Sequence, residues 1–200
     1  MPPVIVTPAE YLSAVFPRGD CVLVFSDWQS QGEAIYQNTR LKVDRKALGS
    51  FERGHAHGVW FLANPIDAQY HYNPRQGGYS RRSEESITSF RHVVLESDCL
   101  PVEQWLRILV QIRIPIVSIV SSGSKSLHAL GRIEAESKAD WDRAVRGWMP
   151  HLVKVGADRN ALTAIRLTRL PGCYRGDRLQ ELLYLNPDPQ CGPIWKSEEL

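Results

Sequence analysis

Two acidic residues, Glu96 and Asp98, end a run of apolar residues in the stretch FRHVVLESD. Val93, Val94 and Leu95 predict a buried strand, and side chains two positions apart lie on the same face of a strand. The two carboxylates are therefore expected to point the same way, within reach of one divalent cation. Carboxylate oxygens suit Mg²⁺ or Mn²⁺, which also accept oxygen ligands from substrate phosphates. The plainer alternative is an acidic turn at the end of a strand.

A polar turn with the sequence SSGSKS, residues 121–126, follows further along the chain, before a strand that carries His128. Such a turn can direct backbone N–H groups, hydroxyls and the ammonium of Lys125 toward an anion. It is not a Walker A loop, because Ser124 precedes Lys125 and the next apolar run, LHALGRI, is typical of a strand rather than a helix. The turn therefore predicts an anion site between two strands, with an ordinary polar hairpin as the alternative.

The remaining candidates for chemistry are Asp158, which follows a short apolar run, and Arg166 and Arg169, which precede a Pro-Gly pair. Several carboxylates beside a group of cations are what metal-assisted nucleotidyl transfer requires. Metals align the attacking and leaving oxygens while the cations hold a triphosphate. His128, beside the polar turn, is interpreted as a hydrogen-bond donor to a phosphate group. The alternatives are a packed core histidine and surface salt bridges for the two arginines.

The composition is that of a globular protein of one compact domain or two small lobes, with 43% hydrophobic and 23% charged residues among 200. The net charge of +2 means that a nucleic-acid surface must be local. The sequence has no apolar run long enough for a membrane span and no signal-peptide pattern, so a cytoplasmic protein without a membrane partner is expected. The four cysteines are far apart, which predicts reduced thiols rather than disulfides or a zinc site.

The expected elements give an α+β fold. An N-terminal α/β lobe is predicted over residues 1–88, an RRM-like (ferredoxin-like) catalytic sheet of order βαββαβ over 89–187, and a loose tail over 188–200. Together they form one core. The periodicity predicts helices at 8–15, 101–113 and 137–150, and strands at 21–25, 58–62, 90–96, 116–120, 127–133 and 179–185.

Residues 70–82, with the sequence YHYNPRQGGYSRR, predict a mobile loop just before the acidic strand. Aromatic residues interleaved with cations suit a single-stranded nucleic acid, whose bases stack and whose phosphates need neutralising. The residues expected to bind a template are Arg75, Tyr79, Arg81 and Arg82. A solvated surface loop is the alternative.

These features, in this order, resemble the archaeo-eukaryotic primase superfamily, or primase-polymerases, in its bacterial phage and plasmid branch. The resemblance covers about residues 58–185. VVLESD matches the first motif, apolar residues followed by two acids, and SLH at 126–128 matches the second, a small polar residue two positions before a histidine. AD at 157–158 matches the third motif, RLPG at 169–172 matches a stretch that often follows it, and GVWFLANP resembles the end of the first lobe.

The resemblance implies a primase or DNA polymerase that transfers nucleotides from nucleoside triphosphates onto a primer on a single-stranded DNA template, with a replicative helicase as a further partner. It implies a two-metal site for Mg²⁺ or Mn²⁺ held by Glu96, Asp98 and Asp158. The implied nucleotide-binding residues are Ser124, Lys125, Ser126, His128, Arg166 and Arg169. The zinc stem that many relatives carry cannot be built here.

Two other classes of function stay open. A rolling-circle initiator endonuclease would use His55 and His57 as metal ligands and one of Tyr70, Tyr72 and Tyr79 as nucleophile, but it leaves the three acids unexplained. A non-catalytic RRM-like module would read bases with aromatic residues on its central strands, where this chain has LES and LHAL.

Overall fold

The computed structural model describes residues 6–27, 29–37, 48–52, 54–74 and 77–189. The first part of the chain forms α1 (Pro8–Val15), β1 (Cys21–Phe25), β2 (Glu33–Tyr36), β3 (Gly54–His55), β4 (Trp60–Leu62), β5 (His71–Asn73) and β6 (Gly78–Ser80). The second part forms β7 (Phe90–Glu96), α3 (Val102–Leu109), β8 (Ile116–Ser121), β9 (Leu127–Ala135), α4 (Lys138–Lys154), the 3₁₀ turn η1 (Arg159–Ala161), β10 (Leu167–Arg169), β11 (Tyr174–Arg175), β12 (Arg178–Leu179) and β13 (Leu182–Leu185).

Two helices begin at the predicted N-caps. The Thr7 side chain accepts from the backbone N–H of Glu10, whose carboxylate accepts from the N–H of Thr7 in return, so that α1 has a capping box. Ser137 caps α4 in the same position. The predicted end of that helix at Pro150 is wrong, because α4 continues to Lys154. Proline removes one helical hydrogen bond, and burial of Leu152 in the following turn offsets that loss.

The main sheet has the strand order β13-β8-β9-β7, and all its pairs are antiparallel. The α+β class is confirmed, with antiparallel sheets and helices in one chain. The finer RRM-like arrangement is not confirmed. A ferredoxin-like sandwich would place the last strand next to β7, whereas β13 pairs with β8 at the other edge.

A second sheet, of order β10-β4-β1-β2, belongs mostly to the N-terminal part. Its outer strand β10 comes from the C-terminal part and pairs with β4, so that Arg169 lies opposite Trp60. The short β11 likewise pairs with β3. Residues from both predicted lobes therefore share sheets, and the proposed boundary at residue 88 stays a prediction.

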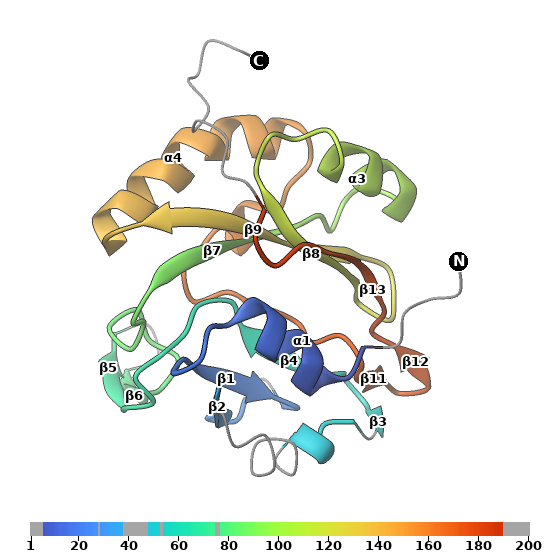
Figure 1. Ribbon diagram of the computed structural model, residues 1–200. Helices are drawn as coiled ribbons and strands as arrows, with labels where there is room; N and C mark the ends of the chain where they lie inside the picture. The colour runs from blue at the N-terminus through green and yellow to red at the C-terminus, as the bar shows by residue number, and fades with distance from the viewer. Residues whose placement is uncertain (1–5, 28, 38–47, 53, 75–76, 190–200) are drawn as a thin grey trace.

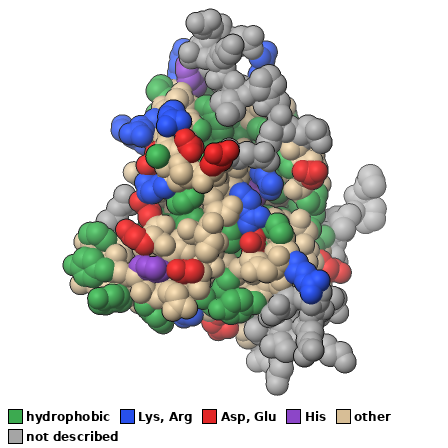
Figure 2. Space-filling model, turned by 60° about the vertical axis from the view of Figure 1, so that its left-hand side comes forward, with side chains coloured by type: hydrophobic (Ala, Val, Ile, Leu, Met, Phe, Trp, Pro, Cys, Tyr) green, Lys and Arg blue, Asp and Glu red, His purple; other side chains and the backbone are tan. Residues whose placement is uncertain are grey.

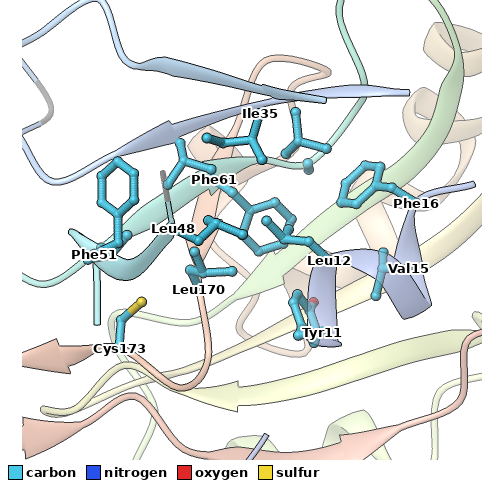
Figure 3. Packing of buried hydrophobic residues seen from close by; sticks show 14 of the residues in the cluster. Tyr11, Leu12, Val15, Phe16, Ile35, Leu48, Phe51, Phe61, Leu170 and Cys173 are labelled. Carbon is cyan, nitrogen blue, oxygen red and sulfur yellow. The ribbon is translucent and has the colours of Figure 1, made fainter. Parts of the chain in front are cut away.

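The main sheet is covered on both faces (Figure 1). Helices α3 and α4 lie on one face, and α1 with the second sheet lies on the other. Alternation along β7 sends Val93 and Leu95 into the core with α3 and α4, and sends Val94 into the core with α1. In that second core the α1 side chains surround the ring of Phe61 (Figure 3), with Tyr11 and Phe16 edge-on to it.

The predicted mobile loop at 70–82 is wrong in its structure, because these residues include an antiparallel hairpin. Strands β5 and β6 pair from His71 opposite Ser80 to Asn73 opposite Gly78. The turn between them closes with a hydrogen bond from the Gly77 N–H to the Asn73 carbonyl, and Gly77 adopts a φ of 64° that suits glycine.

No helix in the described part of the chain is both long and apolar enough to cross a bilayer. Cys99 and Cys173 are free thiols, Cys21 is buried in β1, and Cys191 lies outside the described residues. Acidic and basic side chains are intermixed on the face that Figure 2 presents, which agrees with a net charge of +2.

Candidate active site

Three acidic side chains converge at the end of β7. Glu96, Asp98 and Asp158 each offer one carboxylate oxygen, and these oxygens lie within 4.8 Å of one another. Glu96 is the last residue of β7 and is only 3% exposed, Asp98 is exposed, and Asp158 is intermediate. Among the described residues, this is the one group of three or more His, Cys, Asp or Glu side chains that could hold a metal ion. The group contains the same three residues that the sequence predicted.

Backbone contacts bring Asp158 to the end of β7 although it lies far along the chain. Its N–H donates to the carbonyl of Glu96 (2.8 Å), and its carboxylate accepts from the N–H of Asn160 (2.9 Å). One residue after Glu96, the Ser97 hydroxyl donates to the Gly156 carbonyl (2.6 Å). The loop before η1 is thus fastened to the strand end, which fixes the separation of the two carboxylates.

Arg166 lies directly against the acids. Its Nη2 contacts Glu96 Oε1 and is 3.7 Å from Asp158 Oδ2. Burial lowers the pKa of the Arg166 guanidinium below its usual range. A buried carboxylate needs a compensating charge, and Arg166 supplies it to Glu96.

His128 contacts the other oxygen of the same carboxylate. It lies on β9 directly opposite Glu96, with Nδ1 3.1 Å from Glu96 Oε2. Burial, with added repulsion from Arg169 and Arg175, lowers the pKa of His128 to about 3. The imidazole is therefore neutral near pH 7, so this close contact is not an ion pair, and Nδ1 also lies 3.5 Å from the Thr168 hydroxyl oxygen. Because Nδ1 faces Glu96, a nucleotide could contact His128 only through Nε2.

Arg169 has no acidic partner among the residues that the structure describes. It is 8% exposed, its Nη1 donates to the carbonyl of His57 (2.7 Å), and its guanidinium lies 4.3 Å from the ring centroid of Trp60. The Nε is buried without a hydrogen-bond partner. Burial and the nearby Arg175 lower the pKa of Arg169 to about 10, so the group stays charged at neutral pH. A cation stacked on an aromatic ring is stabilised by the ring quadrupole.

The polar turn connects β8 to β9 next to these cations. The Ser122 N–H donates to the Ser126 carbonyl (2.9 Å), and Gly123 has a φ of 67°. The Ser126 hydroxyl donates to Ser122 Oγ (3.2 Å), while Ser124 and Lys125 are exposed. The predicted nucleotide-binding turn therefore presents Ser124 and Lys125 to solvent, whereas Ser126 is engaged within the turn.

Arg175 is a residue of this region that the sequence reasoning missed. A Cβ on Gly123 would lie 3.3 Å from the Arg175 Cβ, and a Cβ on Gly58 would lie 3.1 Å from it. The proximity of Arg175 to His128 and Arg169 also appears in their lowered pKa values. The signal available in the sequence was the Gly-Asp pair at 176–177, which predicts a hairpin that turns Arg175 back toward the core.

The predicted template-binding residues fall in different surroundings. Tyr79 is 70% exposed on β6. Arg81 lies over the ring of Tyr70, 5.1 Å from its centroid, and donates to the Gly32 carbonyl (2.7 Å). Arg82 donates from Nε to the carbonyl of Ile165 (3.1 Å). Arg75 lies outside the described residues.

Arg82, from the N-terminal part of the chain, lies near Arg166. Burial lowers the pKa of its guanidinium below the usual range, and the nearby charge of Arg166 adds to that decrease. The structure therefore brings Arg82 close to Arg166, whereas Tyr79 lies on the hairpin and Arg81 directly after it. The residues of the rival endonuclease stand apart from the acids: His55 bonds through its ring to the Ser50 carbonyl (3.2 Å).

The donor set fits the metal that the acids imply. Three carboxylates within 4.8 Å of one another are hard oxygen ligands of the kind that Mg²⁺ and Mn²⁺ prefer, and no thiolate contributes to the group. Glu96, Asp98 and Asp158 could hold a metal ion in this arrangement.

No protein-family model matches the sequence, and no curated protein matches it either. One solved structure is similar: the AEP domain of the cyanophage S-2L primase-polymerase (PrimPol), at a TM-score of 0.53 and 16% sequence identity. The similarity covers 90% of this chain and 89% of that domain. The described chain thus shares its fold, at a distant level, with the AEP domain of a phage primase-polymerase.

Proposed function

We propose that the protein is a metal-dependent nucleotidyltransferase, a primase or DNA polymerase, that adds nucleotides to a primer on single-stranded DNA. The observation that carries this proposal is the convergence of three carboxylates beside a group of cations, on a fold shared with a primase-polymerase domain. Carboxylates for a metal and cations for a triphosphate are the two parts that nucleotidyl transfer requires.

In this proposal Glu96, Asp98 and Asp158 are the metal ligands. A divalent cation held there would supply neutralisation of the charge that develops as the primer hydroxyl attacks and pyrophosphate leaves. His128 orients the Glu96 carboxylate through the contact of its Nδ1 with Oε2. Arg166 balances the charge of that carboxylate from the other side.

The triphosphate is assigned to the cations on the other side of Glu96. Arg169 supplies positive charge, and the exposed Ser124 and Lys125 extend the donors along the polar turn. Ser126, His128 and Arg166 are the other residues predicted from the sequence, and Arg175 is added from the structure. This assignment is supported by the absence of a carboxylate within ion-pair distance of Arg169 or Arg175 in the described part of the chain. A phosphate group would satisfy these donors through charge-assisted hydrogen bonds.

The template is assigned to Arg75, Tyr79, Arg81 and Arg82. Tyr79 offers an exposed ring for stacking, and Arg82 lies near Arg166, where it would bind a backbone phosphate of the template or primer. The helicase partner expected from the sequence has no support from the structural comparison. No contact in the described residues favours the endonuclease or the non-catalytic module.

The test is extension of a labelled primer on a single-stranded template with Mg²⁺ or Mn²⁺, using ribonucleotides and deoxynucleotides in separate reactions. Asp158→Asn should reduce the extension rate about a thousandfold or more, because it removes a charged metal ligand worth several kcal/mol in the transition state. Asp188→Asn, at an exposed position, is the matched control and should keep the wild-type rate.

Near-wild-type extension by Asp158→Asn would contradict the metal assignment. A covalent link between a tyrosine and cleaved DNA, found in place of extension, would favour the endonuclease instead.

A further inference from the structure

Arg166 lies against two of the three carboxylates that would hold a metal ion. Its Nη2 touches Glu96 Oε1 and is 3.7 Å from Asp158 Oδ2. Mg²⁺ or Mn²⁺ binds oxygens at about 2.1 Å, so an ion held by these residues would have to approach the same carboxylates closely. The guanidinium and the ion would therefore compete for them.

The position of Arg166 is explained by the negative charge of Glu96. The Glu96 side chain is only 4% exposed, and a buried carboxylate without a positive partner is strongly unfavourable. Arg166 neutralises it when no ion is bound. A divalent ion would take over that role, and its charge would repel the guanidinium.

The surroundings of Arg166 allow it to move. Its side chain is 28% exposed, and the polar contacts of its guanidinium in the described structure are those with Glu96 and Asp158. The neighbouring Arg82 differs, because its Nε is fastened to the carbonyl of Ile165. Repulsion between these two arginines, visible in the lowered pKa of Arg82, also favours release of the one that is not fastened.

We propose that Arg166 is the resident counter-ion of the metal-free site, and that metal binding displaces it toward the incoming triphosphate. This inference rests on the proposed function, since it takes the acids to be the metal ligands. It assigns Arg166 two alternative partners, the carboxylates before metal binding and the phosphates afterwards. Metal and nucleotide binding are then positively coupled through one side chain.

The test measures Mn²⁺ binding to the nucleotide-free protein, by the electron paramagnetic resonance signal of free Mn²⁺. Arg166→Gln should bind Mn²⁺ on the order of tenfold more tightly than wild type, because the competing charge is gone. Arg166→Lys keeps the charge but loses the planar fork, so its affinity should lie between the two. Arg159→Gln removes an equal charge from an exposed arginine next to Asp158 and should change the affinity by less than about twofold.

Thermal unfolding gives a second readout that does not depend on activity. Without metal, Arg166→Gln should melt below wild type, because the buried carboxylate loses its partner, and Mn²⁺ should raise its melting temperature more than that of wild type. If Arg166→Gln does not fold without metal, the affinity of Arg166→Lys decides the question.

Equal or weaker Mn²⁺ binding by Arg166→Gln, with wild type binding normally, would overturn this inference and leave the proposed function standing. Failure of wild type and both Arg166 variants to bind Mn²⁺ would overturn the metal site itself, and the proposed function with it.

Discussion

The two sides of the candidate site differ in how their charges are balanced. On the acidic side, the Glu96 carboxylate already has Arg166 against one oxygen and His128 against the other. On the basic side, Arg169 is held by a carbonyl and an aromatic ring, and Arg175 has no carboxylate within ion-pair distance in the described residues. The Glu96 carboxylate thus has polar partners within the protein, whereas no carboxylate of the described residues balances the charges of Arg169 and Arg175.

This difference indicates how the two ligands of the site would bind. A metal must replace a positive group that is already present, so its net binding energy is reduced by the loss of that contact. A triphosphate meets cations that have no competing acid, so it does not have to break an ion pair. We therefore expect changes on the basic side to act on nucleotide affinity directly, and changes at Arg166 to act on both ligands.

The largest effect in this comparison is expected at Arg175. Arg175→Ala should weaken binding of ATP or dATP by about tenfold to a hundredfold, since it removes a charge-assisted contact to phosphate. Affinity for Mn²⁺ alone should stay close to wild type. Arg178→Ala, on the paired strand of the same hairpin, is the matched control. Fluorescence titration with a labelled nucleotide measures the change.

An equal loss of nucleotide affinity in the Arg175 and Arg178 variants would mean that the hairpin attracts the nucleotide by its net positive charge, without a specific contact from Arg175. Unchanged nucleotide affinity in Arg175→Ala would show that the triphosphate lies elsewhere.

A smaller effect is expected at Gly58, whose lack of a side chain leaves room for the Arg169 guanidinium. Gly58 has a φ of 81°, and a Cβ there would lie 2.8 Å from Arg169 Nη1 and 2.1 Å from Gln180 Oε1. Gly58→Ala should therefore lower the free energy of unfolding by about 1–3 kcal/mol and displace Arg169, with a several-fold loss of nucleotide affinity. Chemical denaturation and nucleotide titration measure the two changes.

Gly147→Ala is the matched control, because Gly147 lies in α4 with open space around its Cα. It should leave the site intact and stabilise the helix by about 0.5–1 kcal/mol. If Gly58→Ala binds nucleotide normally, the position of Arg169 does not matter for the triphosphate.

The smallest effect on ligand binding is expected at His92, a second buried histidine near the other end of β7 from Glu96, because its change acts on stability. Burial lowers the pKa of His92 to about 3, and its Nδ1 bonds to the Ala63 carbonyl (2.8 Å). The unfolded chain takes up this proton as the pH falls below about 6.5, and the folded protein does not, so stability falls with decreasing pH.

His92 should therefore account for a loss of about 2 kcal/mol in the free energy of unfolding between pH 7.5 and pH 5. His92→Asn, which does not titrate, should reduce this pH dependence by about that amount. Denaturation curves at the two pH values measure it. An identical pH dependence in wild type and variant would mean that His92 is protonated in the folded protein.

Local patterns in the sequence determined several parts of the structure. The bounds of α1 follow from Thr7 and Pro8, and β1 follows from the apolar run at 21–25. Strand alternation predicted that Glu96 and Asp98 share a face, and the two carboxylates do converge, although β7 ends at Glu96 and Asp98 lies in the bend that follows it. These features depend on residues close in sequence, so they could be predicted.

Where local rules failed, contacts from distant residues were the cause. Burial of Leu152 carries α4 past Pro150, and residues 70–82 pair as a hairpin although their composition predicted a loop. The last strand joins β8 instead of β7 because the chain first crosses to the second sheet as β10. Pairing between strands far apart in sequence leaves no local periodicity by which it could be predicted.

For the candidate site, the sequence by itself determined the residue types: three acids, a histidine, a polar turn and two arginines. Only the tertiary structure decided their partners. The register of β7 against β9 sets His128 opposite Glu96, the pairing of β10 with β4 stacks Arg169 on Trp60, and the loop before η1 brings Asp158 to the strand end. Arg82 and Arg175 reach this region through tertiary contacts: Arg82 donates to the Ile165 carbonyl, and Arg175 packs beside Gly58 and Gly123.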